Sequence, residues 1–309
     1  MNTDLIRKIL ARADENEPFE LHQIGGGRNN RAYKILAAGK TYFLKSFYPE
    51  SAKTRKTFQR ETDFLRYAGK IGLSGTARLL AEDPENYLML TEYIDGEKYA
   101  SPVKDADIRS AAAWIRELNG AENLPDLEQA ADGCRCNSDH FTGVRKRLKQ
   151  FFDLNLPALN QLLVHFDHEL KTLESVCLPE CRRQIVSPSD FGFHNVLVRD
   201  NRLYFVDFEY AGLDDPAKLV CDFFCQPDFP IAYSVMPQFA ETAFPDEENL
   251  QERIAALYSV HRIKWSCILM NSLLPDRISA RHYAGESLSG FHTVISQVEK
   301  YYWGENHEA

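Results

Sequence analysis

Three oxygen-bearing side chains are grouped in the stretch SPSDFGFHNVLVRDNRLYFVDFEYAG, past the middle of the chain. Asp190 is followed five residues later by Asn195, and Asp207 comes after two short apolar runs that an Asp-Asn pair separates. Such a pair between two apolar runs predicts a β-hairpin, with Asn195 at its start and Asp207 at its end. Carboxylate and amide oxygens are ligands that a hard cation such as Mg²⁺ prefers. The stretch therefore predicts a magnesium site at this hairpin.

A glycine-rich loop, IGGGRNNRAYK, lies between two predicted strands near the N-terminus. Gly25, Gly26 and Gly27 would let the backbone approach a ligand and direct N–H groups at a phosphate, although a plain hairpin also uses such glycines. The loop is not a dinucleotide-binding fingerprint, because no GxGxxG opens a helix. Residues 39–41 (GKT) resemble the end of a Walker A motif, but Lys34 stands where that motif requires glycine, so a P-loop is rejected.

A lysine and a glutamate further along the chain favour the phosphate-binding interpretation of this loop. Lys45 lies in the strand pattern YFLKSF, and Glu61 lies in the helical pattern FQRETDFL that follows. A lone lysine in such a strand is most often a surface residue. A strand lysine held by a glutamate on a packed helix, however, presents an ammonium group to nucleotide phosphates.

Short strands and two helices are predicted to position these residues. A helix over 3–14 precedes strands between 19 and 47, and a helix over 53–69 precedes strands in ARLLAE and YLMLTEYI. After Asp95-Gly96 helical patterns dominate, at 104–118, 139–152, 156–175, 215–225, 248–274 and 277–302. An irregular loop is expected over 120–138. The simplest organisation is a strand-rich N-terminal lobe followed by a helical C-terminal lobe.

Length and composition restrict the class of protein. With 309 residues, 44% hydrophobic and 26% charged, the chain is expected to be globular with two lobes. Its net charge of −9 gives no support for a nucleic-acid or anionic-membrane partner, and the basic cluster in 145–149 is expected to be a solvated helix face. No apolar run is long enough to predict a membrane span.

The cysteines favour reduced thiols in the cytoplasm over a metal centre. There are seven, and the N-terminus lacks the apolar core of a secretion signal. No pair forms CxxC, and Cys221 and Cys225 lie in an apolar run that predicts a buried helix face. Zinc is therefore not expected.

The order and spacing of the motifs resemble the aminoglycoside phosphotransferase and choline kinase-like branch of the protein-kinase fold. The resemblance covers about residues 20–225 and identifies IGGGRNNRAYK as the glycine loop. It identifies Lys45 as the phosphate lysine and Glu61 as its partner. In LMLTEYIDG it identifies a hinge whose Glu92 and Ile94 would offer backbone groups to adenine.

The same resemblance assigns the C-terminal motifs and implies a function. SDFGFHN resembles the catalytic loop, with Asp190 as base and Asn195 as metal ligand, and VDFEYAGLDDP resembles the metal-binding segment, with Asp207 as ligand. The implied fold is α+β, protein-kinase-like, with a nucleotide-binding lobe over 1–94 and a helical catalytic and acceptor-binding lobe over 95–309. The implied activity uses ATP or GTP with Mg²⁺ to phosphorylate a hydroxyl of a small molecule, such as a sugar, an amino alcohol or an aminoglycoside.

The chain departs from the family pattern at three places. Pro188 stands where the family usually has a bracing histidine, two residues before the base. Leu219 stands where an aspartate usually follows the Asp-Pro pair, and Asp222, one turn later, is expected to brace the loop instead. Residues 226–309 match no defined acceptor pocket.

Acceptor-binding residues are predicted in the helix HRIKWSCILMN. Arg262 and Trp265 are three residues apart and share a face, so they are candidates for gripping an anionic, ring-shaped acceptor. His261 and Lys264 share the adjoining face and are either part of that site or solvated. The aromatic residues of this half of the chain are typical of a packed core or of a box for a quaternary ammonium: Phe223, Phe224, Tyr233, Tyr258 and Trp265.

Two other classes of protein compete with a small-molecule kinase. An inactive, nucleotide-sensing module is suggested by Pro188, but the complete set of Lys45, Asp190, Asn195 and Asp207 argues against it. A protein kinase is disfavoured because GLDDPAKL follows the metal segment almost at once, which leaves no room for a peptide-docking loop.

Overall fold

The computed structural model describes residues 2–25, 30–48, 53–100, 102–275 and 290–304. The chain packs into two units, one made of residues 1–131 and 186–213, and the other of residues 132–185 and 214–309. This division by packing groups residues differently from the predicted lobes, 1–94 and 95–309, which remain a prediction about how nucleotide and acceptor binding are divided. Each unit is described below by itself.

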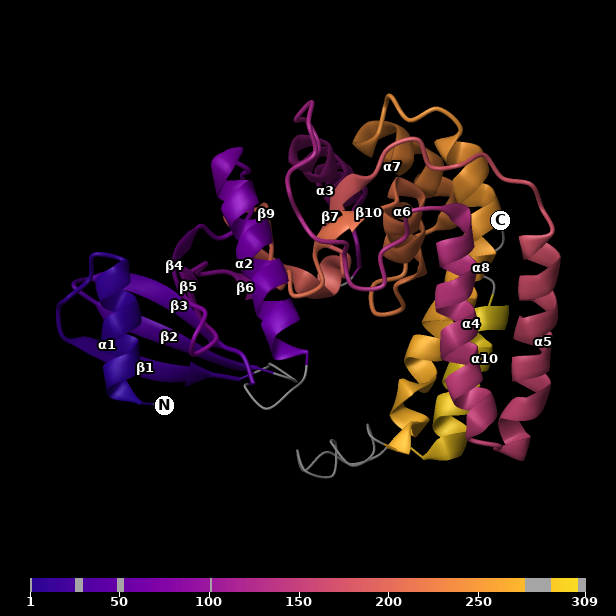
Figure 1. Cartoon of the computed structure of the whole chain (residues 1–309), viewed down its shortest axis with the longest axis horizontal. Helices are drawn as coiled ribbons and strands as arrows, with labels where there is room; N and C mark the ends of the chain where they lie inside the picture. The colour runs from indigo at the N-terminus through magenta and orange to yellow at the C-terminus, as the bar shows by residue number, and fades with distance from the viewer. Residues whose placement is uncertain (1, 26–29, 49–52, 101, 276–289, 305–309) are drawn as a thin grey trace. The chain divides into compact units, whose positions relative to one another are not determined.

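The first unit is built on a five-stranded antiparallel sheet in the order β1-β2-β3-β5-β4. Its strands are β1 (Phe19–Ile24), β2 (Arg31–Ala37), β3 (Lys40–Ser46), β4 (Leu79–Asp83) and β5 (Leu88–Glu92). Helix α1 (Thr3–Arg12) crosses one face of this sheet (Figure 1) and is capped by the Asn2 side chain, which accepts from the Asp4 N–H at 2.9 Å. Its Ile6, Ile9 and Leu10 are buried against alternate residues of the strands, so one sheet face is a closed apolar core.

The predicted catalytic hairpin is present with the predicted turn. Strands β8 (Val196–Arg199) and β9 (Arg202–Phe205) pair antiparallel, with Arg199 opposite Arg202. The two-residue turn between them, Asp200 and Asn201, has positive φ at both positions (51° and 56°), the geometry that matches the twist of a hairpin and that Asp and Asn tolerate. Strand β6 (Glu97–Lys98) adds to the other edge of β8.

Helices and short segments complete the first unit. They are α2 (Thr54–Lys70), α3 (Asp105–Leu118), the 3₁₀ turn η1 (Phe193–Asn195), and the ends of β7 (Ile185–Ser187) and β10 (Gly212–Asp214), which pair with each other. The side chain of Trp114 on α3 stacks against Phe191, at 5.6 Å between ring centroids, and its indole N–H donates to the Ser74 carbonyl. The segment that carries Asp190 is therefore anchored on the core of this unit.

The second unit is helical. Its helices are α4 (Asn137–Asp153), α5 (Pro157–Glu174), α6 (Pro216–Cys225), α7 (Met236–Ala243), α8 (Leu250–Met270) and α10 (Phe291–Trp303), with 3₁₀ turns η2 (Tyr233–Val235) and η3 (Asn271–Leu273). The long helix α8 packs against α4, α5, α6 and α10, and Figure 1 shows α4, α5 and α10 running along it. The element predictions are confirmed to within a few residues, except that the helix expected over 277–302 is described from Phe291 onward. Residues 276–289 lie outside the described chain.

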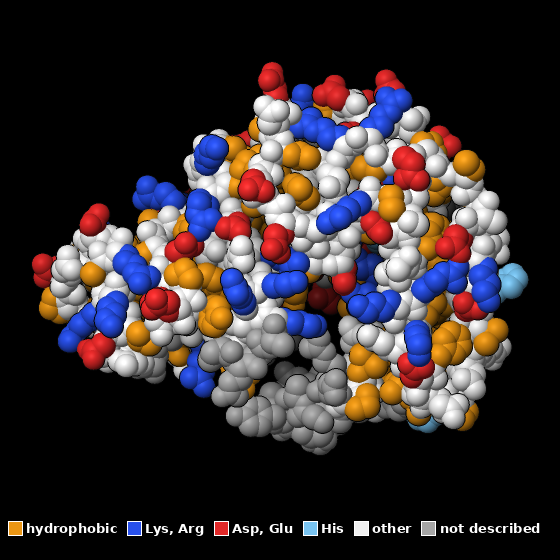
Figure 2. All heavy atoms as spheres, viewed as in Figure 1, with side chains coloured by type: hydrophobic (Ala, Val, Ile, Leu, Met, Phe, Trp, Pro, Cys, Tyr) orange, Lys and Arg blue, Asp and Glu red, His pale blue; other side chains and the backbone are white. Residues whose placement is uncertain are grey.

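Surface charge agrees with an ordinary solvated exterior. Figure 2 shows basic and acidic side chains interspersed over the face it presents. On α4 the predicted basic face is exposed and paired, with Lys149 2.7 Å from Asp153 and Arg145 in contact with Glu174. Across the described helices, none is both long and apolar enough to cross a membrane.

Candidate active site

A buried lysine joins two carboxylates in the first unit. Lys45 on β3 donates from Nζ to Glu61 Oε2 on α2 at 2.7 Å and to Asp207 Oδ1, which follows β9, at 2.6 Å. Lys45 is 7% exposed and Glu61 3%, whereas the Asp207 side chain is 48% exposed. The predicted Lys45–Glu61 pair is confirmed, and the same ammonium also holds one of the predicted metal ligands.

Charge in this cluster is unbalanced toward the carboxylates. Burial alone would lower the pKa of Lys45, but Glu61, Asp207 and Glu209 raise it above the ordinary lysine value. Burial raises the pKa of Glu61 to about 7, and Asp207 and Glu209 add to this rise while Lys45 opposes it. Because several carboxylates share one ammonium, the cluster is suited to receive a further cation.

Asp207 has a backbone conformation that is unusual for its residue type. Its φ of 67° lies in the left-handed region, where residues other than glycine are uncommon and where observed cases concentrate at functional sites. The preceding Val206 N–H donates to the Asn195 carbonyl at 3.0 Å and so extends the β8–β9 ladder by one bond. Asp207 therefore directly follows a residue that is hydrogen-bonded to Asn195, and the predicted approach of the two side chains stays a prediction.

The loop before the hairpin brings Asp190 and Asn195 into contact. The Asn195 Nδ2 donates to the Asp190 carbonyl at 3.0 Å and lies 3.4 Å from its Oδ2. Since the amide nitrogen is engaged with Asp190, the amide oxygen is the part of the Asn195 side chain that a cation would meet. His194 also contacts Asp190, with 3.2 Å between its Nε2 and the Asp190 Oδ1.

The donor set fits a magnesium ion that also binds nucleotide phosphates. Asn195 and Asp207 would supply one neutral and one anionic oxygen ligand, and Mg²⁺ in such sites typically takes one or two carboxylates and completes its shell with phosphates and water. Among the described residues, no group of three or more His, Cys, Asp or Glu side chains is arranged to hold a metal ion.

The other predicted nucleotide-binding residues lie in the sheet and after it. Gly25 follows β1, whereas Gly26 and Gly27 lie outside the described residues. At the hinge, the Glu92 N–H donates to the Arg78 carbonyl and the Ile94 carbonyl accepts from the Gly96 N–H, so each residue has one backbone group engaged within the chain.

A contact that the sequence did not predict ties the end of the glycine loop to the metal-binding segment. Asn30 donates from Nδ2 to Glu209 Oε2 at 3.0 Å, and its Oδ1 accepts from the Tyr48 N–H at 3.3 Å. Glu209 is 8% exposed, two residues after Asp207. The pair is 179 residues apart in the chain, so no local pattern could have signalled it.

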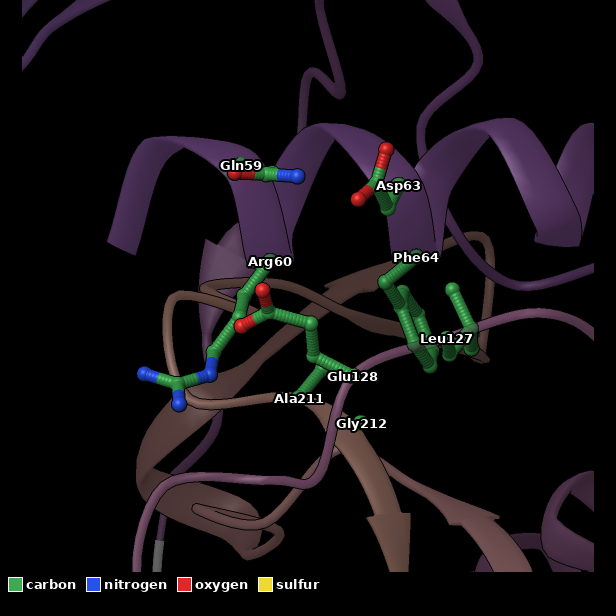
Figure 3. Close-up of a pocket in the computed structure, with 8 residues that line it drawn as sticks. All are labelled: Gln59, Arg60, Asp63, Phe64, Leu127, Glu128, Ala211 and Gly212. Atoms are coloured by element: carbon green, nitrogen blue, oxygen red, sulfur yellow. The ribbon is translucent and has the colours of Figure 1, made fainter. Parts of the chain in front are cut away.

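A small pocket lies beside α2 in the first unit (Figure 3). Arg60 and Phe64 extend from the helix toward Leu127, Glu128 and the Ala211–Gly212 backbone, and Gln59 and Asp63 complete the lining. A Cβ on Gly212 would lie 2.4 Å from the Glu128 carbonyl oxygen, so only glycine permits this close backbone approach. None of the predicted site residues lines the pocket, but α2 also carries Glu61, on the turn between Arg60 and Phe64.

The second unit contains a separate buried ionic cluster around Asp222 on α6. Its carboxylate accepts from the Lys264 Nζ at 2.6 Å and from the Trp265 Nε1 at 3.0 Å, and lies 2.9 Å from the His261 Nδ1. Lys218, one turn earlier on α6, lies 3.2 Å from Asp222 and 2.7 Å from Asp214. Asp222 was expected to brace the catalytic loop. Its described hydrogen bonds instead fix α6 to α8 inside the second unit.

A neighbouring part of this unit continues the network. The Asp215 carboxylate caps α6 by accepting from the Ala217 N–H at 2.7 Å, and the Arg253 guanidinium contacts both of its oxygens. His140 lies 3.2 Å from Asp215 through Nε2 and 3.0 Å from His261 through Nδ1. The polar groups that link α4, α6 and α8 thus have partners although they are buried.

The predicted acceptor residues also have partners within this unit. Trp265 donates to Asp222, whereas Arg262 donates to the Tyr302 carbonyl on α10 and lies over the Tyr302 ring, 4.9 Å from its centroid. Arg262 and Trp265 therefore bind different residues, and Asp222, the partner of Trp265, also contacts His261 and Lys264. Three of the five aromatic side chains agree with the core interpretation, since Phe223, Phe224 and Tyr258 are at most 2% exposed, whereas Tyr233 and Trp265 are half-buried.

Comparisons with known proteins identify the family and the fold of the chain. A sequence model of the Phosphotransferase enzyme family matches residues 20–230. No curated protein matches the chain. The structure is similar to a choline/ethanolamine kinase family protein from Mesorhizobium loti, with a TM-score of 0.62 and 21% identity over 97% of this chain and 95% of that one.

Two further structures have the same fold. Spectinomycin phosphotransferase in its AMP-bound complex gives a TM-score of 0.67 at 11% identity and covers 98% of both chains. The streptomycin–ATP–APH(2")-IIa ternary complex gives 0.61 at 16% identity, over 90% of this chain and 95% of that one. The predicted α+β, kinase-like fold, with a strand-rich N-terminal sheet and a helical C-terminal part, is confirmed.

Proposed function

Because the chain belongs to the phosphotransferase enzyme family, we propose that it transfers the γ-phosphoryl group of ATP to a hydroxyl of a small molecule with the aid of Mg²⁺. The observation that carries this proposal is the Lys45 ammonium, buried and in contact with both Glu61 and Asp207. A fixed cation beside an oxygen ligand is what a nucleotide triphosphate with its metal requires.

In the proposed reaction the acceptor hydroxyl oxygen attacks the γ-phosphorus. A new oxygen–phosphorus bond forms, the bond to the β-phosphate oxygen breaks, and ADP leaves. Asp190 orients the hydroxyl and accepts its proton, and Lys45 neutralises phosphate charge while Glu61 holds it in place. Little covalent chemistry is asked of the protein, so orientation and charge stabilisation account for most of the rate.

Mg²⁺ would be held by the side-chain oxygens of Asn195 and Asp207, and it supplies charge neutralisation on the phosphates when bound. In the structure the Lys45 ammonium is hydrogen-bonded to the Asp207 carboxylate. Binding of Mg²⁺ therefore requires that the Asp207 carboxylate contact both the ammonium and the cation. The glycine loop, including Gly25, and the backbone groups of Glu92 and Ile94 are proposed to complete nucleotide binding.

The acceptor is proposed only at the level of a small molecule with a hydroxyl group. The similar structures include a choline/ethanolamine kinase family protein and a complex with streptomycin, so amino alcohols and aminoglycosides are the first classes to test, followed by sugars. Contact of Arg262 and Trp265 with the acceptor, preference for ATP over GTP, and a cytoplasmic location remain proposals.

The test is a nucleotide-consumption screen with Mg²⁺ and ATP over choline, ethanolamine, streptomycin, spectinomycin and simple sugars. With an active acceptor, Asp190→Ala is expected to lower turnover on the order of 10²- to 10⁴-fold while nucleotide affinity survives, because the base and orienting group is lost. Asp153→Ala, which removes an exposed carboxylate on α4, is the matched control.

Near-normal turnover of Asp190→Ala would refute the assignment of the base. Nucleotide binding without transfer to any acceptor or to water, in wild type and variant alike, would favour an inactive nucleotide-binding module instead.

A further inference from the structure

His194 is fixed next to the proposed base by a short, anchored turn. It occupies η1, between Gly192 and the hairpin, and lies four residues after Asp190. Phe193, the preceding residue, is 2% exposed and packs on Tyr99 at 4.6 Å between ring centroids. The turn that presents the imidazole is therefore held by the core, and the contact with Asp190 does not depend on a mobile side chain alone.

The two ring nitrogens of His194 have different surroundings. Nε2 lies 3.2 Å from the Asp190 Oδ1. Nδ1 is buried and has no hydrogen-bond partner among the residues that the structure describes. A proton on Nδ1 would be buried without an acceptor, which is costly. A proton on Nε2 donates a hydrogen bond to the carboxylate.

Consecutive residues thus hold Asp190 from two sides. His194 contacts one carboxylate oxygen, while Asn195 donates to the Asp190 carbonyl and lies near the other carboxylate oxygen. On the N-terminal side, Pro188 has no side-chain donor and Ser189 has a φ of 67°, in the left-handed region. His194 and Asn195, which follow Asp190, both contact its side chain.

We propose that His194 is a positioning residue, whose Nε2–H fixes the Asp190 carboxylate in the orientation that accepts the proton of the acceptor hydroxyl. The inference rests on the proposed function, because it concerns the same base. His194 acts through Asp190 and not on the phosphate. Its loss should therefore lower kcat and leave the KM for nucleotide unchanged.

Two amide substitutions separate the role of Nε2 from that of the ring as a whole. In His194→Gln the amide nitrogen can lie near the former Nε2 position, whereas in His194→Asn it lies near the former Nδ1 and cannot reach Asp190. With Mg²⁺·ATP and water, choline or streptomycin as acceptor, His194→Asn is expected to lose roughly tenfold to a hundredfold in kcat, as one hydrogen bond to a charged group would. His194→Gln is expected to remain within a few-fold of wild type.

Equal losses in both variants, or a fully active His194→Asn, would overturn the proposal, and a rise in nucleotide KM alone would assign His194 to nucleotide binding. The ring tautomer gives a measurement that needs no turnover. Nitrogen-15 NMR of labelled histidine, assigned with His194→Gln, should show a proton on Nε2, and a bare Nε2 would contradict the inference. If Asp190→Ala is fully active while the tautomer is as expected, the assigned base fails and the geometry of His194 stands.

Discussion

Each unit of the molecule contains a buried lysine between two carboxylates, and the two arrangements differ in how they are closed. Lys218 on α6 lies between Asp214, at the end of β10, and Asp222, one turn later on α6, and all three side chains are at most 5% exposed. Lys45 lies between Glu61 and Asp207, which come from a helix and from the end of a hairpin, and Asp207 is 48% exposed. The cluster around Lys218 is called the sealed cluster because its charged side chains are buried. The cluster around Lys45 is called the open cluster because the Asp207 carboxylate reaches solvent.

This difference separates a cluster that stabilises the second unit from one that we propose binds nucleotide and Mg²⁺. In the sealed cluster burial alone would raise the pKa of Asp222, but Lys264, Lys218 and His261 lower it well below the ordinary value, so its negative charge is fully used inside the unit. In the open cluster there are more carboxylates than ammonium groups. The exposed carboxylate, Asp207, can therefore contact a cation as well as Lys45. The same residue types therefore serve packing in one unit and are proposed to bind nucleotide and metal in the other.

The largest effect is expected when the sealed cluster is broken. Asp222→Ala leaves Lys264 and Lys218 with too few partners and should lower the free energy of unfolding by about 3–5 kcal/mol, because a buried charge loses its counter-charge. Urea denaturation followed by circular dichroism measures the loss. A change below about 1 kcal/mol would mean that water reaches these lysines and that the cluster is not sealed.

A substitution in the open cluster should have its main effect on turnover and a smaller effect on the free energy of unfolding. Lys45→Met is expected to reduce turnover on the order of 10²- to 10³-fold, as the loss of one fixed electrostatic contact to the reacting group does. Its cost in stability should be smaller than that of Asp222→Ala, because Glu61, with a pKa already near 7, can take up a proton when its partner is removed. Steady-state kinetics and urea denaturation of the same samples test both parts.

Lys40→Met, at the exposed start of the same strand, is the matched control for this substitution. A Lys45→Met protein that keeps its turnover but loses as much stability as Asp222→Ala would erase the distinction between the two clusters.

The smallest expected effect, and the sharpest test of the comparison, is that the stability contributed by the two clusters changes with pH in opposite directions. Burial raises the pKa of Glu61 from 4.5 to about 7, so its contribution to stability is complete below about pH 4.5 and is lost as the pH rises through 7. Burial lowers the pKa of His261 from 6.5 to about 4, so its contribution is complete above about pH 6.5 and is lost as the pH falls toward 4.

Unfolding free energies measured across this range for Glu61→Gln and His261→Gln should each lack one of the two slopes. The Glu61 variant should retain the loss at low pH, and the His261 variant should retain the loss at high pH. Identical pH profiles for both variants would show that neither group titrates as its burial implies.

Local patterns in the sequence account for most of the elements and for part of the candidate site. The hairpin that carries Asn195 and Asp207 was predictable because Asp200 and Asn201 suit a turn with positive φ, and the Lys45–Glu61 pair because strand and helix follow each other directly. The contact between Asn30 and Glu209 was not predictable, since its partners are 179 residues apart.

The contacts of Asp222 and of His194 show two further reasons why sequence patterns did not predict the site completely. The partners of Asp222 come from α6 and α8, and helical spacing says which residues share a face but not which face meets another helix. The contact of His194 with Asp190 depends on the 3₁₀ turn Phe193–Asn195, and no pattern in the sequence indicated a role for His194.

The order in which the chain builds its first unit has a consequence during protein synthesis. That unit consists of residues 1–131 and 186–213, so a growing chain reaches Asp190, Asn195 and Asp207 only after the first helices of the other unit have been made. A nascent chain that stops earlier can pair Lys45 with Glu61 but lacks the proposed base and both proposed metal ligands. Incomplete translation products would then be unable to consume nucleotide, whatever their N-terminal sheet has already folded into.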